Sequence, residues 1–117
     1  MNINFDNNMP IYMQIVDFLK VYIIAGKFKP GEKLPSVRDF ANDLKVNPNT
    51  MQKALQDLEE LKIVYTERTN GKFVTNDEKL IKKYKMDYAK NLTKEYIRNM
   101  KTLGLSLEEI KKIMGEK

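Results

Sequence analysis

Several residue types that carry chemistry are missing from this sequence of 117 residues. It contains no cysteine, which excludes disulfides and a thiolate nucleophile, and no histidine, which removes the commonest metal ligand and general base. It also has no run of about 18 uncharged apolar residues, so neither a membrane span nor a signal peptide is predicted. We therefore expect a cytoplasmic protein that is not an enzyme and uses no metal or cofactor.

Charge is unevenly spread along the chain. The 21 Lys and Arg residues against 16 Asp and Glu residues give a net charge of +5. Residues 76–117 carry 11 basic and 7 acidic side chains, whereas residues 1–75 carry 10 and 9. The balance favours a polyanionic partner. Four lysines lie near the start of residues 76–117: Lys79, Lys82, Lys83 and Lys85. They have two interpretations, a solvated helix face or a surface near flanking DNA.

Apolar residues at three- and four-residue steps predict a first helix that begins at Pro10 and ends near Gly26. The stretch "FKPGEKLPS", residues 28–36, holds two prolines and a glycine and is predicted to be a connector. Ser36 followed by Asp39 is typical of an N-cap with an acidic first turn. The short helix that follows is expected to bury Val37, Phe40, Ala41 and Leu44.

A further short helix is predicted to begin within "KVNPNTMQKAL", residues 45–55. Asn47 can accept hydrogen bonds from orphan N–H groups as the N-cap, and Pro48 fits the first helical position because its missing donor would be unpaired there. Two short helices joined by a tight turn make a helix-turn-helix candidate. The buried stripe of this helix is expected to be Met51, Ala54, Leu55, Leu58 and Leu61.

Residues 63–74, "IVYTERTNGKFV", form two β-rich runs around Asn70-Gly71, a dipeptide that supplies positive φ in a tight hairpin turn. Three helices followed by a hairpin is the order of a winged helix. We therefore predict a mainly α fold with a small β-hairpin wing, in which residues 1–75 form a winged helix-turn-helix domain.

Residues 76–117 are predicted to form a C-terminal two-helix dimerisation segment. Gly104 suits the C-terminal cap of a long first helix, and Ser106 to Glu109 are typical of a capping box that opens the second. The second helix is only about two turns long, so a partner chain is expected to cover the apolar faces. Helical periodicity alone explains the apolar residues on these faces, so they predict no effector site. The predicted dimerisation residues are Ile81, Tyr84, Tyr88, Leu92, Tyr96, Met100, Leu103, Leu107 and Ile110.

The second short helix is the candidate for reading DNA. A helix N-terminus directs N–H groups and a positive dipole at anions, while its first turns offer side chains to base edges. Residues 45–56 contain no acid, whereas three acids follow in residues 57–60. Arg38, near the turn, and Arg68 and Lys72, around the hairpin tip, are expected backbone or minor-groove contacts. The predicted contacts of the helix itself are Asn47, Asn49, Thr50, Gln52 and Lys53.

Each of these contacts also has a purely structural reading. Residues 47–50 are typical of ordinary helix capping, and they cap the helix whether or not they also contact DNA. Arg38 has the alternative of a surface ion pair with Asp39 or Asp43. The cations at the hairpin tip have the alternative of a solvated turn.

Several motifs occur together between residues 9 and 74: Pro10-Ile11-Tyr12 with Gln14-Ile15, Gly26, Pro30-Gly31, Leu34-Pro35-Ser36, Arg38, Val46-Asn47-Pro48-Asn49-Thr50, Leu58-Glu59 and Gly71-Lys72-Phe73-Val74. In this combination the sequence resembles the N-terminal domain of the GntR family of winged helix-turn-helix transcription regulators. The tail resembles the YtrA-like branch, whose C-terminal segment serves for dimerisation. To the DNA contacts the resemblance adds Ser36 and the wing residues Asn70 and Gly71.

The resemblance implies a homodimeric repressor that binds double-stranded DNA at an inverted-repeat, palindromic operator, with control of neighbouring ABC-transporter genes as the expectation from the branch. Three positions depart from the family, two of them in the recognition helix. Gln52 stands where the wider family commonly has arginine, and Lys53 where the YtrA-like branch often has it. Lys62 replaces a glycine often found after the recognition helix. The base preference of this chain should therefore be sought at residues 52 and 53.

Other functional classes were weighed against DNA binding. A winged-helix protein-interaction module that never engages DNA is the main alternative, and a titration with random duplex DNA at low salt discriminates the two. A single-stranded nucleic-acid binder would need exposed stacking aromatics, whereas Tyr65 and Phe73 are expected in the hairpin core. The carboxylate pairs at 59–60 and 108–109 have no histidine, cysteine or glycine-rich loop beside them, which argues against an enzyme.

Overall fold

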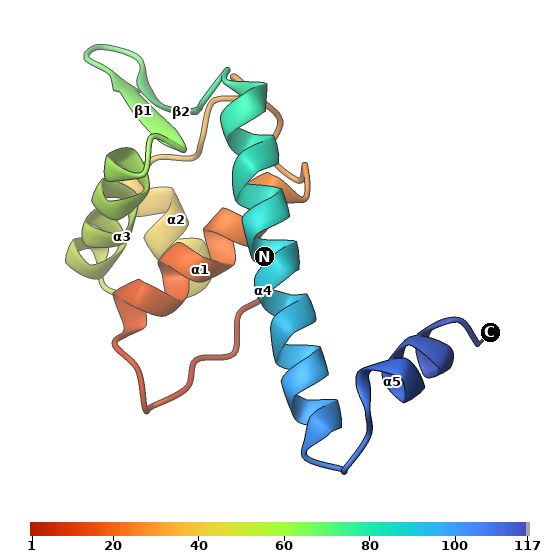
Figure 1. The fold of residues 1–117 in the computed structure, drawn as a ribbon. Coiled ribbons are helices and arrows are strands. Elements are labelled where there is room, and N and C mark those ends of the chain that lie inside the picture. The colour runs from red at the N-terminus through yellow and green to blue at the C-terminus, as the bar shows by residue number, and fades with distance from the viewer. Residues whose placement is uncertain (117) are drawn as a thin grey trace. The chain divides into compact units, whose positions relative to one another are not determined.

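The fold is defined by a computed structural model that describes residues 1–116 (Figure 1). Its elements are, in chain order, α1 (Ile11–Ile24), α2 (Val37–Leu44), α3 (Pro48–Glu60), β1 (Val64–Glu67), β2 (Gly71–Val74), α4 (Glu78–Lys101) and α5 (Leu107–Met114). This order confirms the predicted mainly α fold with a hairpin wing. Two compact units are present, residues 1–83 and a second that begins at Tyr84, so the division falls inside α4, whereas the predicted domain boundary lies before it.

Helix α1 supplies one side of the core of the first unit. Ile15, Leu19 and Ile23 recur every four residues and are buried, and the helix packs mainly against α3. Pro10 is the N-cap at φ −55° and ψ 136°, so the helix begins one residue later than predicted. The extended ψ is the reason, because a residue inside the helix would need ψ near about −42°.

Helices α2 and α3 enclose the rest of the core. Phe40, Met51, Leu55 and Leu58 are at most 1% exposed. A chain of aromatic contacts joins the elements, since the ring of Phe28 in the connector lies 6.1 Å from Phe40 and 5.3 Å from Tyr22 of α1. The predicted stripes are therefore confirmed, except that Val37 and Leu61 are only half-buried. Leu61 is the C-cap of α3 and no longer lies on its inner face.

The turn between α2 and α3 follows from the residues at its two ends. Lys45 adopts a left-handed conformation at φ 57° as the C-cap of α2, and the N–H of Val46 then donates to the carbonyl oxygen of Ala41 at 2.9 Å. Asn47 Oδ1 accepts from the N–H of Asn49 at 2.7 Å, and Pro48 is the first residue of α3. The predicted helix-turn-helix is confirmed, and so are its predicted N-caps, Asn47 and Ser36, whose side-chain oxygen accepts from the N–H of Asp39 at 3.1 Å.

Strands β1 and β2 form an antiparallel pair with Val64 opposite Val74 and Glu67 opposite Gly71. The paired rings of Tyr65 and Phe73 stack at 5.5 Å. The connection spans residues 68–70, so the expectation of a tight turn at Asn70-Gly71 is wrong in detail. Of these two residues only Gly71 has a positive φ, 104°, which glycine adopts without steric cost.

The second unit has little interior. No residue of α4 is fully buried, and Gly104 turns the chain after it at φ 82°, as predicted. Ser106 and Glu109 form the predicted capping box. The hydrogen bonds from Ser106 hold the pKa of the Glu109 carboxyl below its usual value. Ile110 of α5 is the one fully buried side chain of this unit among the described residues. In residues 1–116 no helix combines the length and apolar character needed to cross a membrane.

Candidate nucleic-acid interface

The start of α3 presents a polar surface because its apolar residues all face the core. Met51, Ala54, Leu55 and Leu58 are buried, which leaves Asn49, Gln52 and Lys53 exposed and Thr50 half-buried. The side-chain oxygen of Asn47 is engaged in the cap, so the amide nitrogen is the group that remains for a ligand. The first turn contains no acid, and the positive end of the helix dipole lies here.

Two exposed cations flank this surface in the neighbouring segment. Arg38 lies on the first turn of α2 and Lys45 in the turn that precedes α3. Within the described residues Arg38 forms no ion pair with Asp39 or Asp43, and Asp43 instead lies 3.9 Å from the N-terminal ammonium of Met1. Arg38 therefore keeps its five donors available for a ligand.

The wing is tied to the last turn of α3 by a network of polar side chains. Lys72 of β2 forms an ion pair with Glu59 of α3 and donates a hydrogen bond to Thr66 of β1 at 2.9 Å, while Thr66 also donates to Glu59. Lys72 is 16% exposed and Glu59 is 31% exposed. Lys72, a predicted DNA contact, is thus already engaged in holding the wing against α3.

Glu59 is charged in this network. Burial favours its neutral form, but the hydrogen bonds from Lys72 and Thr66, together with the charge of Lys72, outweigh burial and hold the pKa of Glu59 below its usual value. A charged acceptor strengthens the bonds that fix the wing. The position of the hairpin relative to the recognition helix therefore depends on an ionised carboxylate.

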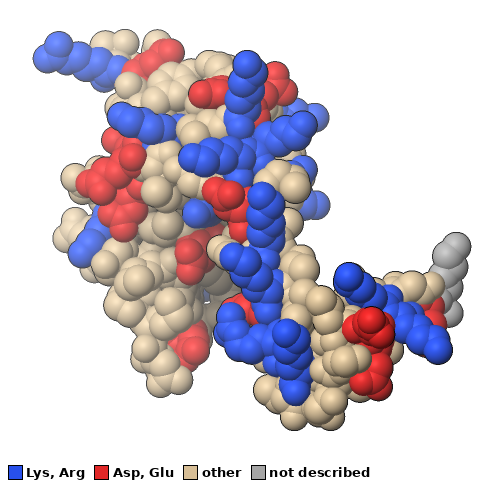
Figure 2. Space-filling view, viewed as in Figure 1, with Lys and Arg blue, Asp and Glu red and all other residues tan. Residues whose placement is uncertain are grey.

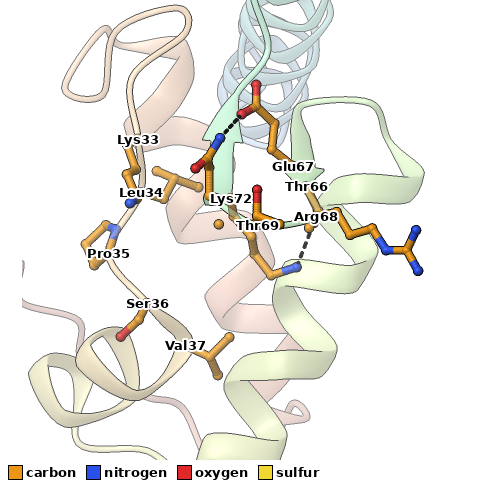
Figure 3. A pocket seen from close by; sticks show the side chains of 12 residues that line it. Lys33, Leu34, Pro35, Ser36, Val37, Thr66, Glu67, Arg68, Thr69 and Lys72 are labelled. Atoms are coloured by element: carbon orange, nitrogen blue, oxygen red, sulfur yellow. Dashed lines mark hydrogen bonds between the residues drawn. The ribbon is translucent and has the colours of Figure 1, made fainter.

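A groove of about 390 Å³ separates the start of α2 from the wing (Figure 3). Residues 33–37 form one wall and residues 66–72 the other. The guanidinium of Arg68 points away from the groove, and the nearby tip is braced by Asn70, which donates to Glu67 at 3.0 Å. The predicted DNA contacts that line this groove are Ser36, Arg68, Asn70, Gly71 and Lys72.

Lys33 also lines the groove, and the sequence interpretation missed it. It forms an isolated bridge with Phe73, and the next residue, Leu34, donates its N–H to the carbonyl of Lys72 at 2.8 Å. The connector thus runs along β2 as an additional extended segment. Pro35 offered a signal, because the residue before a proline is driven toward extended conformations. The lysine is thereby held beside Gly71 at the wing.

The geometry is that of a winged helix with a polar, acid-free helix start, and comparison with known proteins decides the family. Residues 11–74, more than half of the chain, match the model of bacterial regulatory proteins of the gntR family. The chain belongs to the GntR family. It is accordingly a DNA-binding transcription regulator, and its relatives are regulators, not enzymes.

Relatives of similar length extend the GntR match to the tail. The chain is 36% identical to the transcriptional regulator YhcF of Bacillus subtilis, over 94% of this chain and 91% of YhcF. It is also 36% identical to the transcriptional repressor YtrA of the same organism, over 89% and 81% of the two chains. The predicted YtrA-like character is supported by this second match.

Solved structures agree with the GntR assignment. A GntR family transcriptional regulator from Listeria monocytogenes superposes with a TM-score of 0.87 at 43% identity, covering 94% of this chain and 96% of the other. The DNA-binding domain of AraR, solved in complex with operator ORX1, superposes with a TM-score of 0.57 at 25% identity, covering 64% and 95%. The second likeness therefore leaves about a third of this GntR protein uncovered.

The tail of this GntR protein carries most of the residues predicted for dimerisation, and they differ in exposure. Ile110 is buried within the single chain, and Ile81, Tyr84 and Met100 are half-buried. The exposed members are Tyr88, Leu92, Tyr96, Leu103 and Leu107. Lysine and arginine side chains also follow α4 along its length in Figure 2. Met86, Ile113 and Met114 are exposed as well, although they were not among the residues predicted for dimerisation.

Proposed function

We propose that the protein is a homodimeric repressor that inserts α3 of each subunit into successive major grooves of an inverted-repeat operator. The observation that carries the proposal is the acid-free, exposed start of α3, with Asn49, Gln52 and Lys53 beside the turn cation Lys45. Asn and Gln can pair with adenine through two hydrogen bonds, and lysine can reach guanine or phosphate. These groups suit direct reading of base edges.

The wing and the start of α2 are proposed to hold the DNA backbone. Arg38 and Arg68 are exposed, and Lys33, Ser36 and Gly71 line the groove between the two segments. Contacts of this kind set the register of the protein on the duplex without reading its sequence. Lys72 would act through the wing position, because its ammonium is engaged by Glu59 and Thr66.

Dimerisation is proposed through the exposed apolar side chains of α4, of α5 and of the turn between them. Leu92 is 52% exposed and Leu103 is 73% exposed, and contiguous exposed apolar surface is typical of protein interfaces. Two subunits related by a twofold axis would present two copies of α3 to two half-sites about 34–36 Å apart. Repression in the cytoplasm, supported by the similarity to the repressor YtrA, and control of ABC-transporter genes both belong to this proposal.

The deciding experiment is selection of bound sequences from a random duplex pool by the purified protein, combined with its solution mass. The proposal expects an inverted repeat bound by a particle with twice the 13.7 kDa chain mass. A single half-site bound by a 13.7 kDa monomer would refute the dimer part. Failure to retain any duplex at low salt would instead favour an interaction module without DNA binding.

A substitution at Arg38 tests the backbone contacts. Arg38→Ala should weaken binding to all sequences alike and reduce the slope of log K against log salt by about 0.9, the value for one phosphate contact. Lys27→Ala, an exposed cation after α1 that lies outside the groove and α3, is the matched control and should leave the slope unchanged. A changed base preference with an unchanged slope would make Arg38 a base reader instead.

A further inference from the structure

The ammonium of Lys53 lies over an aromatic ring from a different helix. Its Nζ is 4.0 Å from the ring centroid of Tyr12, which belongs to the first turn of α1. This distance is well within the limit of about 6 Å for a cation–π interaction. Tyr12 precedes the buried Ile15 by three residues, so it lies near the α1 face that packs against α3. The ring is half-buried.

The chemistry of this partner matters for DNA binding. A carboxylate partner would cancel the charge of the lysine and repel a phosphate, whereas an aromatic face holds the ammonium and leaves its full charge in place. Within residues 1–116 no carboxylate forms an ion pair with Lys53. The first turns of α1 and α3 contain no acid either. The contact therefore orders a cation without neutralising it.

The direction of the contact also separates Lys53 from its neighbours on α3. Asn49 and Gln56 share its helix face, being four residues before and three residues after it. The contact holds the ammonium of Lys53 over a ring of α1, the helix that packs against the buried face of α3. The edges of a major groove are bordered by the phosphate backbones, so a cation held at the flank of a recognition helix meets phosphate before base edges.

We infer that Tyr12 is a positioning residue for DNA binding, and that its ring holds Lys53 at the flank of α3 for a contact with a duplex phosphate. This inference rests on the proposed function. It assigns Lys53 to the backbone and leaves base reading to Asn49 and Gln52. Because a guanidinium also stacks on aromatic rings, arginine at position 53 is expected to stack on the ring of Tyr12 in the same way.

A double-mutant cycle on the full-length protein tests the inference, with the selected duplex as the probe. Tyr12→Leu should weaken binding by about two- to fivefold, as expected for an exposed cation–π contact, and the loss should vanish when Lys53→Met is also present. Tyr12→Phe keeps the ring and should bind like the wild type. Lys53→Arg should retain the dependence on Tyr12.

A separate readout distinguishes the phosphate from a base. Lys53→Met should lower the salt slope by about 0.9 and leave the selected sequence unchanged. An altered base preference with an unchanged slope would overturn the backbone assignment. If Tyr12→Leu weakens binding equally with and without Lys53→Met, the ring does not act through the lysine, and the positioning role fails.

The contact itself is measurable without DNA. The side-chain methylene protons of Lys53 should show a ring-current shift by NMR in the wild type and in Tyr12→Phe, and lose it in Tyr12→Leu. Absence of this shift in the wild type would refute the contact between Tyr12 and Lys53. The positioning role would then fail, while the proposed function would be unaffected. A wild-type protein that shows the shift but binds no duplex would overturn the proposed function, and the positioning role with it.

Discussion

The two compact units carry similar amphipathic patterns but cover them differently. Of the fifteen buried apolar residues in the described chain, fourteen lie in residues 1–83 and one, Ile110, lies in the second unit. Of the eleven large apolar residues that are exposed, eight lie in the second unit. A helical apolar stripe thus becomes a core only where other elements of the same chain are available to cover it. The difference supports the proposal that a partner chain covers the exposed apolar residues of the tail.

The largest effect is expected from a cavity in the first unit. Leu55→Ala removes a side chain that is 0% exposed and should lower the free energy of unfolding by about 2–5 kcal/mol in urea denaturation. Met13→Ala, at a position on α1 that is 42% exposed, is the control and should change it by less than about 0.5 kcal/mol. Equal losses of unfolding free energy in Leu55→Ala and Met13→Ala would contradict the difference between buried and exposed positions.

The next largest effect, on subunit association, is expected at the exposed apolar residues of α4. Leu92→Glu should weaken subunit association by about 2 kcal/mol or more, because it places a charge in the proposed interface. Light scattering should then report 13.7 kDa for the variant and, under the proposed dimer, twice that mass for the wild type. Asn91→Glu introduces the same side chain one residue away and about 100° around the helix, and should leave the dimer intact. Dissociation by both variants would point to general disruption of α4.

A smaller effect is expected where the wing joins α3. Glu59→Gln should lower the free energy of unfolding by about 1 kcal/mol near neutral pH, because Lys72 loses a charged acceptor. The folded pKa of Glu59 is lowered, so its stabilising contribution is present above the unfolded pKa, near 4.5, and is lost as the pH falls through the folded value. The difference between wild type and variant should therefore shrink on acidification. The control is Glu60→Gln at the exposed neighbour, which forms no ion pair within the described residues and should change the free energy of unfolding by less than about 0.5 kcal/mol.

The smallest effect contrasts two equivalent caps. Ser106→Ala should cost about 1 kcal/mol locally, because it removes the oxygen that accepts from the N–H of Glu109. Amide exchange should accelerate across α5, which has eight residues and a single buried side chain. Ser36→Ala removes the matching cap of α2, yet Phe40, Ala41 and Leu44 should keep that helix protected. Faster exchange in α2 than in α5 would contradict the comparison.

The local features could be predicted because their causes lie within a few residues. The caps at Asn47 and Ser106 and the positive φ at Gly71 follow from side-chain chemistry at neighbouring positions. The hairpin loop was misjudged because Asn70 bonds back to Glu67 and leaves the left-handed conformation to Gly71 alone. Propensity indicates that a turn forms but not which hydrogen bonds settle its length.

The interface was predicted less completely than the fold. The sequence indicated the start of α3 through its lack of acids, but Lys72 was assigned to DNA without knowledge that Glu59, thirteen residues away, engages it. Tyr12 was noted only as part of a family motif, and its ring turns out to hold Lys53. These contacts join residues on different elements, so they cannot be predicted from residue spacing or composition.

By itself the sequence determined the element order, the caps at Ser36, Asn47 and Ser106, and the polar start of α3, since these depend on periodicity and on bonds between close neighbours. Only the tertiary structure decided which charges are engaged and which are available. Packing α1 on α3 brought Tyr12 beneath Lys53, and folding the hairpin against α3 paired Lys72 with Glu59. The interaction of two charged or aromatic groups depends on their distance in space, which the chain fixes only when its core has formed.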